Sequence, residues 1–138
     1  MAYDCFFQDI SNSVLTGQFD RLSAKCDVAL PVYVDGRVIV YQTRAAMQAG
    51  LEIYRAILRR DGVTRAETRI VAQSLSRGRH STFWVETTYL DSGNQKVGGA
   101  TIRYFCRRGA CGLVVQMVEY LETSWATRVQ DFESFLAA

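Results

Sequence analysis

The sequence VGGATIRYFCRRGACGLVVQMVEYLE, residues 97–122, carries the strongest signal for the fold of this chain. Two runs rich in β-branched and aromatic residues, 97–107 and 111–122, are joined by Arg108-Gly109-Ala110, which is typical of a tight turn. Both runs exceed the usual strand length of about 5–6 residues. The sheet that they form must therefore twist and bend, and we expect a long antiparallel hairpin that curves over a core.

The rest of the chain extends this hairpin into an α+β domain. The N-terminal part is expected to form a helix from Asp4, its N-cap, to a stop at Gly17, then a short helix (18–25) and a hairpin (26–34 and 37–42) that turns at Asp35-Gly36. A longer helix capped by Thr43 (44–60) follows. Two β-runs (64–76 and 79–90) then lead into the hairpin described above, and a last helix is expected at 125–136. Helices segregated from consecutive strands favour the α+β class. We predict one domain over residues 1–138, with a short hairpin and a four-stranded meander forming a curved antiparallel sheet, cone-like, around the N-terminal helices.

Composition excludes several classes of protein. The chain has 138 residues and a net charge of +2, with 16 Lys+Arg against 14 Asp+Glu, so we expect no nucleic-acid partner. The longest apolar run, residues 28–34, is far shorter than the roughly 20 residues of a membrane span, so we expect no membrane partner. No positive charge precedes Arg21, which argues against a secretory signal and for a cytoplasmic location.

Metal and redox sites are not expected either. The chain has one histidine and four cysteines without C-x-x-C spacing, which argues against a zinc site. Free thiols are the simplest interpretation, although a disulfide between Cys106 and Cys111 across the turn is an alternative. We expect neither a metal nor a cofactor.

The last β-run carries the leading catalytic candidate, Glu119. Strict alternation places it on the inward face with three apolar residues, Leu113, Val115 and Met117. A carboxyl group there would be desolvated, which suits a general acid or base. Asp27, which shares the first hairpin with Tyr33, is a second acid that could face the mouth of a cavity. The alternatives are that a bulge or an arginine partner makes Glu119 structural, and that Asp27 is a solvated residue at a strand start.

Four aromatic residues are candidates for binding a ligand: Tyr33, Tyr54, Trp84 and Tyr104. Tyrosine and tryptophan combine an apolar ring with a polar tip that needs a partner when buried, which suits a small ring compound. Ordinary core filling is the alternative. His80, the only histidine, follows a turn, and we favour a surface position over a catalytic role.

The residues that alternate with Glu119 along the β-run 111–122 predict an interface. Val114, Val118 and Tyr120 would form an apolar patch on the outer face of the sheet. A homodimer that packs sheet on sheet would cover this patch, and we expect such a dimer.

These features resemble the SnoaL-like branch of the nuclear-transport-factor-2-like superfamily, a cystatin-like α+β cone. The resemblance rests on LTGQFDRL (15–22), the hairpin at Asp35-Gly36 and GLVVQMVEYLE (112–122), and spans residues 4–122. It implies a dimer and a pocket for apolar ring compounds, with isomerase, dehydratase, epoxide hydrolase or cyclase activity in some members. Ile10 stands where ketosteroid-isomerase-like members have a tyrosine, and Pro31 is flanked by Leu30 and Val32 where those members place an acid.

Three functions follow from these observations. The first is a pocket protein that binds a small apolar or ring-containing molecule, with cofactor-free acid/base lyase, isomerase or hydrolase chemistry. The second is a non-catalytic module for binding a small molecule or for dimerisation. The third is an adaptor for a partner protein. Fold by itself does not decide among them.

Overall fold

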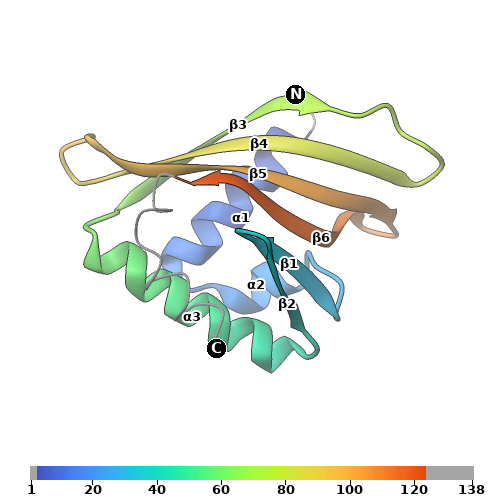
Figure 1. The fold of residues 1–138 in the computed structure, drawn as a ribbon, viewed down its shortest axis with the longest axis horizontal. Helices are drawn as coiled ribbons and strands as arrows, with labels where there is room; N and C mark the ends of the chain where they lie inside the picture. Colours follow the sequence, from blue (N-terminus) through green and yellow to red (C-terminus); the bar gives the residue numbers. More distant parts are fainter. Residues whose placement is uncertain (1–2, 124–138) are drawn as a thin grey trace.

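The computed structural model, which describes residues 3–123, forms one curved sheet over three helices (Figure 1). The elements in order are α1 (Asp4–Thr16), α2 (Phe19–Ser23), β1 (Leu30–Val34), β2 (Arg37–Tyr41), α3 (Arg44–Arg60), β3 (Arg65–Gln73), β4 (His80–Leu90), β5 (Lys96–Gly109) and β6 (Gly112–Thr123). The predicted α+β class and the curved sheet are confirmed. The last helix, predicted at 125–136, lies outside the described residues. Among residues 3–123, no helix has the length and apolar character needed to cross a membrane.

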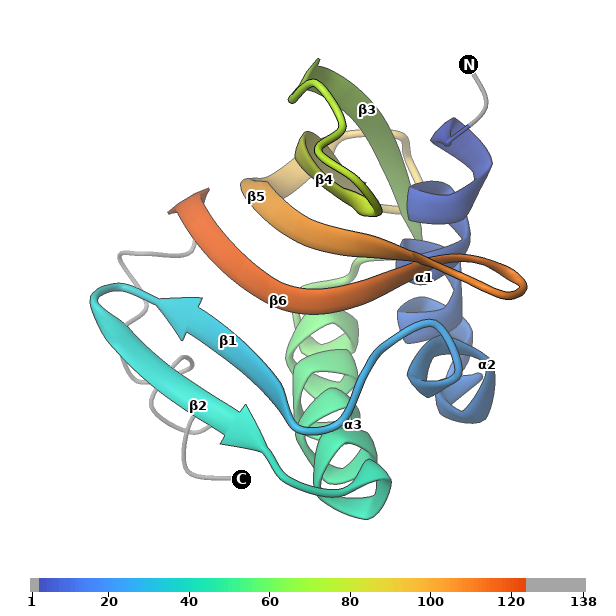
Figure 2. The ribbon, with the colours of Figure 1, turned by 90° about the vertical axis from the view of Figure 1, so that its right-hand side faces the viewer.

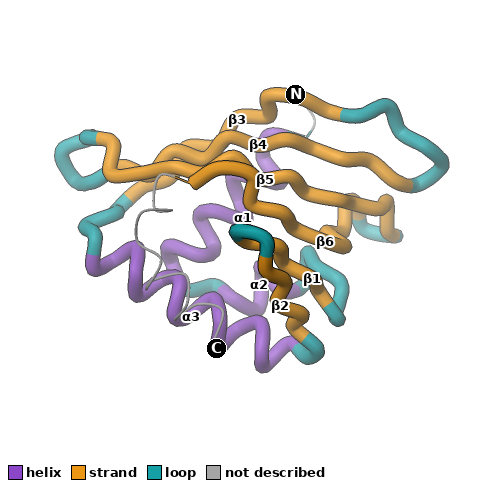
Figure 3. Tube along the Cα trace, viewed as in Figure 1, coloured by secondary structure: helices purple, strands orange, loops and turns teal. Residues whose placement is uncertain are grey.

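The six strands follow the order β2-β1-β6-β5-β4-β3 (Figure 3). Strands β3 to β6 form the predicted antiparallel meander. Strand β1 pairs with β6 in parallel, Val32 opposite Val118, so the sheet is mixed and the expectation of a wholly antiparallel sheet is wrong. The reason is topological, because the β1–β2 hairpin is separated from β6 by most of the chain and can join the sheet edge in either direction. Figure 2 shows the curvature of this sheet around α1 and α3.

Local sequence signals explain where the elements begin and end. The Thr43 hydroxyl accepts a hydrogen bond from the Ala46 N–H at 3.1 Å and caps α3 as predicted. Gly17 ends α1 with a left-handed φ of 75°. Asp4 is the first residue of α1, whereas the N-cap is Tyr3 without a side-chain hydrogen bond, so the predicted Asp4 cap is wrong. Its carboxylate in the first turn still complements the helix dipole.

The core fills the space between the concave face of the sheet and the helices. Phe7 from α1, Leu58 from α3 and Phe83 from β4 are almost completely buried. Gly50 lies in α3 against Tyr41, and a Cβ atom at position 50 would lie 2.2 Å from the Tyr41 hydroxyl oxygen. Glycine at this position therefore permits close contact between α3 and β2.

Two bulges in β6 change which side chains face this core. Phe105 pairs with Met117 and Cys106 with Val115, which leaves Gln116 as an extra residue. Leu121 is a second extra residue, because Thr101 pairs with Glu122 and Ile102 with Tyr120.

The bulge at Gln116 moves the side chains of residues 117–120 to the opposite face from the one that strict alternation predicts. Val118 pairs with buried Tyr104, and Tyr120 with buried Ile102, so both turn inward. The predicted exposed patch of Val114, Val118 and Tyr120 is therefore wrong for Val118 and Tyr120. Val114 remains on the outer face, opposite Arg107.

Candidate functional site

Four tyrosines from four elements meet between α3 and the sheet, and we call them the tyrosine cluster: Tyr54 (α3), Tyr89 (β4), Tyr104 (β5) and Tyr120 (β6). The hydroxyl oxygens of Tyr54 and Tyr89 lie 3.0 Å apart in a hydrogen bond. Tyr120 and Tyr104 lie close enough to Tyr54 for their charges to affect the pKa of its hydroxyl group. Tyr54 is thus the centre of this cluster in the interior.

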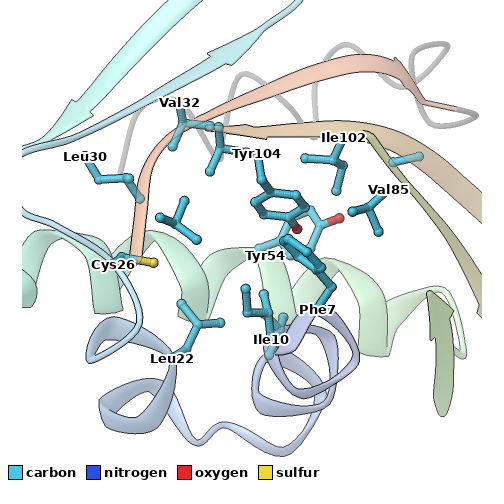
Figure 4. Packing of buried hydrophobic residues seen from close by; sticks show 14 of the residues in the cluster. Phe7, Ile10, Leu22, Cys26, Leu30, Val32, Tyr54, Val85, Ile102 and Tyr104 are labelled. Carbon is cyan, nitrogen blue, oxygen red and sulfur yellow. The ribbon is translucent and has the colours of Figure 1, made fainter. Parts of the chain in front are cut away.

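The surroundings of this cluster are apolar. The rings of Tyr104 and Phe7 have centroids 4.9 Å apart. Figure 4 shows Tyr54 and Tyr104 together above Phe7, next to Val85 and Ile102 of the sheet. Tyr54, Tyr89 and Tyr104 are buried and Tyr120 is partly buried.

Burial keeps these hydroxyl groups protonated. Desolvation raises the pKa of Tyr89 to about 12, and it raises the pKa values of Tyr54, Tyr104 and Tyr120 further. Neighbouring tyrosines add to the rise for Tyr54, Tyr104 and Tyr120, because their negative forms would repel one another. At neutral pH the cluster is therefore a set of neutral hydroxyl groups that can both donate and accept hydrogen bonds.

A further hydroxyl lies on the same face of the sheet. Thr87 is two residues before Tyr89 on β4 and is almost completely buried. Within residues 3–123, its Oγ1 has no hydrogen-bond partner. Buried hydroxyl groups are usually paired, since leaving one unpaired costs about 1–3 kcal/mol. The interior therefore offers hydrogen-bonding capacity that these residues do not use themselves.

Charged side chains lie elsewhere. Among residues 3–123 no Asp, Glu, Lys, Arg or His is buried as a whole residue, although the side chain of Asp61, the C-cap of α3, is only 8% exposed beside Arg60. The same residues contain no group of three or more His, Cys, Asp or Glu that could hold a metal ion. The cluster can therefore bind and orient a polar atom, and its own four members supply neither a carboxylate nor an imidazole to move a proton.

Glu119 does not face this interior, and the prediction of an inward position is wrong. The bulge at Gln116 turns it to the outer face, where it pairs with Arg103 of β5. The Arg103 Nε–H donates to the Glu119 Oε1 at 2.9 Å. The guanidinium also lies over two rings, at 5.9 Å from the centroid of Trp84 and 5.1 Å from that of Phe105. Both alternatives named for Glu119, a bulge and an arginine partner, are present together.

Asp27 also lies beside an arginine. Its carboxylate accepts two hydrogen bonds from Arg107, at 2.8 and 3.0 Å. These bonds hold the pKa of Asp27 below its ordinary value against the opposing effect of desolvation. Neither acid has the desolvated, unpaired carboxyl group that a general base in a dry pocket requires, and a catalytic role for either stays a prediction.

The four aromatic candidates divide between the two faces of the sheet. Tyr54 and Tyr104 meet in the cluster as predicted candidates for a pocket. Tyr33 is 39% exposed and pairs with Glu119, and Trp84 pairs with Arg103, so both lie on the outer face. They are not part of the same site.

The remaining polar candidates lie outside the cluster. His80 is exposed, and its Nδ1 lies 3.1 Å from the Gln116 Oε1. All four cysteines are free thiols. Burial raises the pKa values of Cys26 and Cys106 to about 12, which makes both poor nucleophiles at neutral pH.

Two members of the cluster, Tyr89 and Tyr120, were not among the predicted site residues. Tyr89 follows the core parity Phe83, Val85, Thr87 along β4, so alternation contained the signal. Tyr120 could not be found in this way, because the bulge at Gln116 reverses its parity.

Comparison with known proteins shows the fold. No family model matches this chain, and no curated protein matches it. Solved structures match over most of its length. A domain of unknown function with a cystatin-like fold from Nostoc punctiforme has a TM-score of 0.67 at 13% identity, over 96% of this chain and 84% of that one.

Two further structures agree. A second Nostoc punctiforme protein of unknown function with a cystatin-like fold has a TM-score of 0.62 at 10% identity, over 86% of this chain and 88% of that one. An NTF2-like protein with a cystatin-like fold from Novosphingobium aromaticivorans has a TM-score of 0.61 at 19% identity, over 89% and 84%. The chain therefore has the cystatin-like, NTF2-like fold, and its function must be argued from its own residues.

Proposed function

We propose that this protein binds a small, mostly apolar, ring-containing molecule between α3 and the concave face of the sheet. The observation that carries the proposal is the tyrosine cluster centred on Tyr54, with the 3.0 Å hydroxyl contact to Tyr89, inside apolar surroundings. The cystatin-like fold of the structural neighbours is consistent with a ligand between sheet and helices. The SnoaL-like resemblance in the sequence predicts the same class of ligand.

The chemistry of the tyrosine cluster indicates which ligand polarity and charge it would accept. Apolar residues such as Ile10, Val85 and Ile102 would exclude water from the ring of a ligand. Burial of the ring against these residues would contribute to the free energy of binding. A tyrosine O–H in this environment donates a stronger hydrogen bond than it does in water. A carbonyl or phenolic oxygen on the ring would accept that bond, whereas an ionised ligand would be buried without an opposite charge. We therefore propose a neutral ring compound with one or two oxygen atoms.

Binding is favoured over acid/base catalysis by the same residues. A general base works best when its pKa is near the working pH, and burial moves the tyrosine pKa values away from it. Both predicted acids, Asp27 and Glu119, are paired with arginines on the outer face. The described residues therefore support a binding protein better than an acid/base enzyme.

The proposal is tested with 2-naphthol, a fluorescent ring compound with one hydroxyl group. We expect saturable binding that Tyr54→Phe weakens about three- to tenfold, since one hydrogen bond is worth about 0.5–1.5 kcal/mol. Tyr33→Phe is the matched control, because it removes a hydroxyl from the outer face. Absence of saturable binding, or equal weakening by both variants, would refute the proposal.

A dimerisation module is the second candidate. The outer face presents Tyr33 and Val38, which are 39% and 52% exposed, beside the partly buried rings of Trp84 and Phe105. A second copy packed on this face would cover them. Light scattering at micromolar concentration should then give about twice 15.6 kDa. A value of one chain would remove this candidate and leave the ligand proposal unaffected.

A further inference from the structure

We propose that one end of the sheet docks on an anionic lipid surface. The residues involved are Leu75, Arg77 and Arg79 of the β3–β4 connection and Arg108 of the β5–β6 hairpin, which we call the arginine tip. In this arrangement Leu75 enters the bilayer interface and the three arginines contact lipid phosphate groups. The proposal does not depend on the ligand that the interior binds.

The fold brings these residues together from two hairpins. Figures 1 and 2 show the β3–β4 and β5–β6 connections at the same end of the sheet. The Arg108 N–H donates to the Arg79 carbonyl oxygen at 2.8 Å, so the two hairpins are in direct contact. Arg77 and His80 exchange backbone hydrogen bonds of 3.0 and 3.1 Å across the turn at Gly78. The arginines are thus carried by ordered turns.

Leu75 projects from this end. This residue is 91% exposed, the highest value among the exposed large apolar residues described. The two neighbouring serines hold its loop against β4. The Ser74 Oγ accepts a hydrogen bond from the Thr82 N–H at 2.9 Å, and the Ser76 and Ser81 hydroxyl oxygens lie 2.8 Å apart. An apolar side chain is therefore presented to solvent by a loop that is fixed on both sides of it.

The charge at this end is positive and not neutralised. Neither residues 68–85 nor residues 92–118 contain an aspartate or a glutamate. Arg107, the neighbour of Arg108, is paired with Asp27. Across residues 3–123, no ion pair involves Arg77, Arg79 or Arg108, and Arg108 donates instead to the neutral Tyr3 hydroxyl at 3.2 Å.

A lipid surface fits this combination better than other anionic partners. The bilayer interface accepts an apolar side chain and cations in one contact, and basic residues near anionic lipids strengthen binding. A nucleic acid would satisfy the arginines but offers little for Leu75, and the residues of the β3–β4 connection include no aromatic ring for stacking on bases. The expectation of no membrane partner rested on the length of the longest apolar run, which does not detect arginines that two hairpins bring together in the fold.

The test is sedimentation of the full chain with vesicles of phosphatidylcholine, with and without phosphatidylglycerol. We expect binding to the anionic vesicles that falls as salt rises. Arg77→Gln and Arg79→Gln should each lower the partition coefficient about fivefold, and Leu75→Ser about tenfold. Arg59→Gln, the same charge change on the exposed face of α3, and Leu121→Ser, at a 41% exposed position, are the matched controls.

Three results would overturn the proposal. The first is equal binding to neutral and anionic vesicles. The second is a loss with Arg59→Gln or Leu121→Ser as large as that with the tip variants. The third is that the protein binds RNA or a polyglutamate peptide but not vesicles, and that Leu75→Ser leaves this affinity unchanged. That result would assign the arginine tip to another class of partner. Circular dichroism of each variant distinguishes loss of docking from loss of folding.

Discussion

The two faces of the sheet differ in the kind of polar side chain that they carry. On the inner face, the Tyr54 and Tyr89 hydroxyl groups pair with each other, and no residue described as buried is charged. On the outer face, Arg103 pairs with Glu119 and Arg107 with Asp27. A buried charge is costly while a neutral hydroxyl is less so. Neutral polar chemistry therefore belongs to the inner face, and charged groups remain near water.

The largest expected effect separates two neighbours on β4. Phe83 is completely buried on the inner face, and Trp84 is partly buried on the outer face. We expect Phe83→Ala to lower the free energy of unfolding by about 3–5 kcal/mol, because it leaves a cavity. Trp84→Ala should cost less than half as much. Urea unfolding measures both, and equal losses would break the distinction between the faces.

The sequence predicts the inward-facing residues well along β4 and poorly along β6. Along β4 the alternation is uninterrupted at Phe83, Val85, Thr87 and Tyr89, so inward residues could be predicted. Along β6 both parities are apolar and neither bulge is marked by glycine or proline, so nothing in the pattern located Gln116 or Leu121 as extra residues.

The order of helices and strands was enough to predict the fold class, whereas predicting the candidate site also required the register between strands. Caps and turns such as Thr43 and Asp35-Gly36 made the helices and the first hairpin predictable. The tyrosine cluster joins residues 54, 89, 104 and 120, whose meeting depends on register between strands. Simple periodicity therefore placed Tyr54 and Tyr104 on inward faces, but the prediction grouped them with Tyr33 and Trp84 from the other face, and a ligand-binding role for any of the four stays a prediction.

A second variant tests how tightly the inner face is packed. A Cβ atom at Gly50 would overlap the buried Tyr41 ring. We expect Gly50→Ala to destabilise the protein by about 1–3 kcal/mol, as overpacking does. At an exposed helix position the same change would stabilise by up to about 1 kcal/mol. The sign of the change in thermal unfolding temperature decides, and a rise in Tm would show that α3 and β2 are not in close contact.

A smaller effect is expected for the hydroxyl pair itself. Removing one hydroxyl with Tyr54→Phe or Tyr89→Phe should cost about 1 kcal/mol, and the double variant should cost less than the sum because the pair is shared. Tyr33→Phe should change stability by a few tenths of a kcal/mol at most, since its side chain is exposed. Additive losses in chemical denaturation would mean that Tyr54 and Tyr89 do not interact.

The smallest effect concerns acid stability on the outer face. Hydrogen bonds from Arg107 lower the pKa of Asp27 in the folded state. A carboxyl group with a lowered folded-state pKa stabilises the protein above its unfolded pKa, and this contribution is lost as the pH falls through the folded value. Asp27→Asn should therefore be less stable than the parent at pH 7, with the difference shrinking below about pH 4. A constant difference across this range would contradict the ion pair.

Contact between the tyrosine cluster and a ring-containing ligand can be measured by NMR of protein labelled with ¹³C at tyrosine Cζ. During titration with 2-naphthol, we expect the resonances of Tyr54, Tyr89 and Tyr104 to shift together with one Kd while that of Tyr33 stays constant. Shifts confined to Tyr33, or no shift at any tyrosine up to the solubility limit of the probe, would contradict the account.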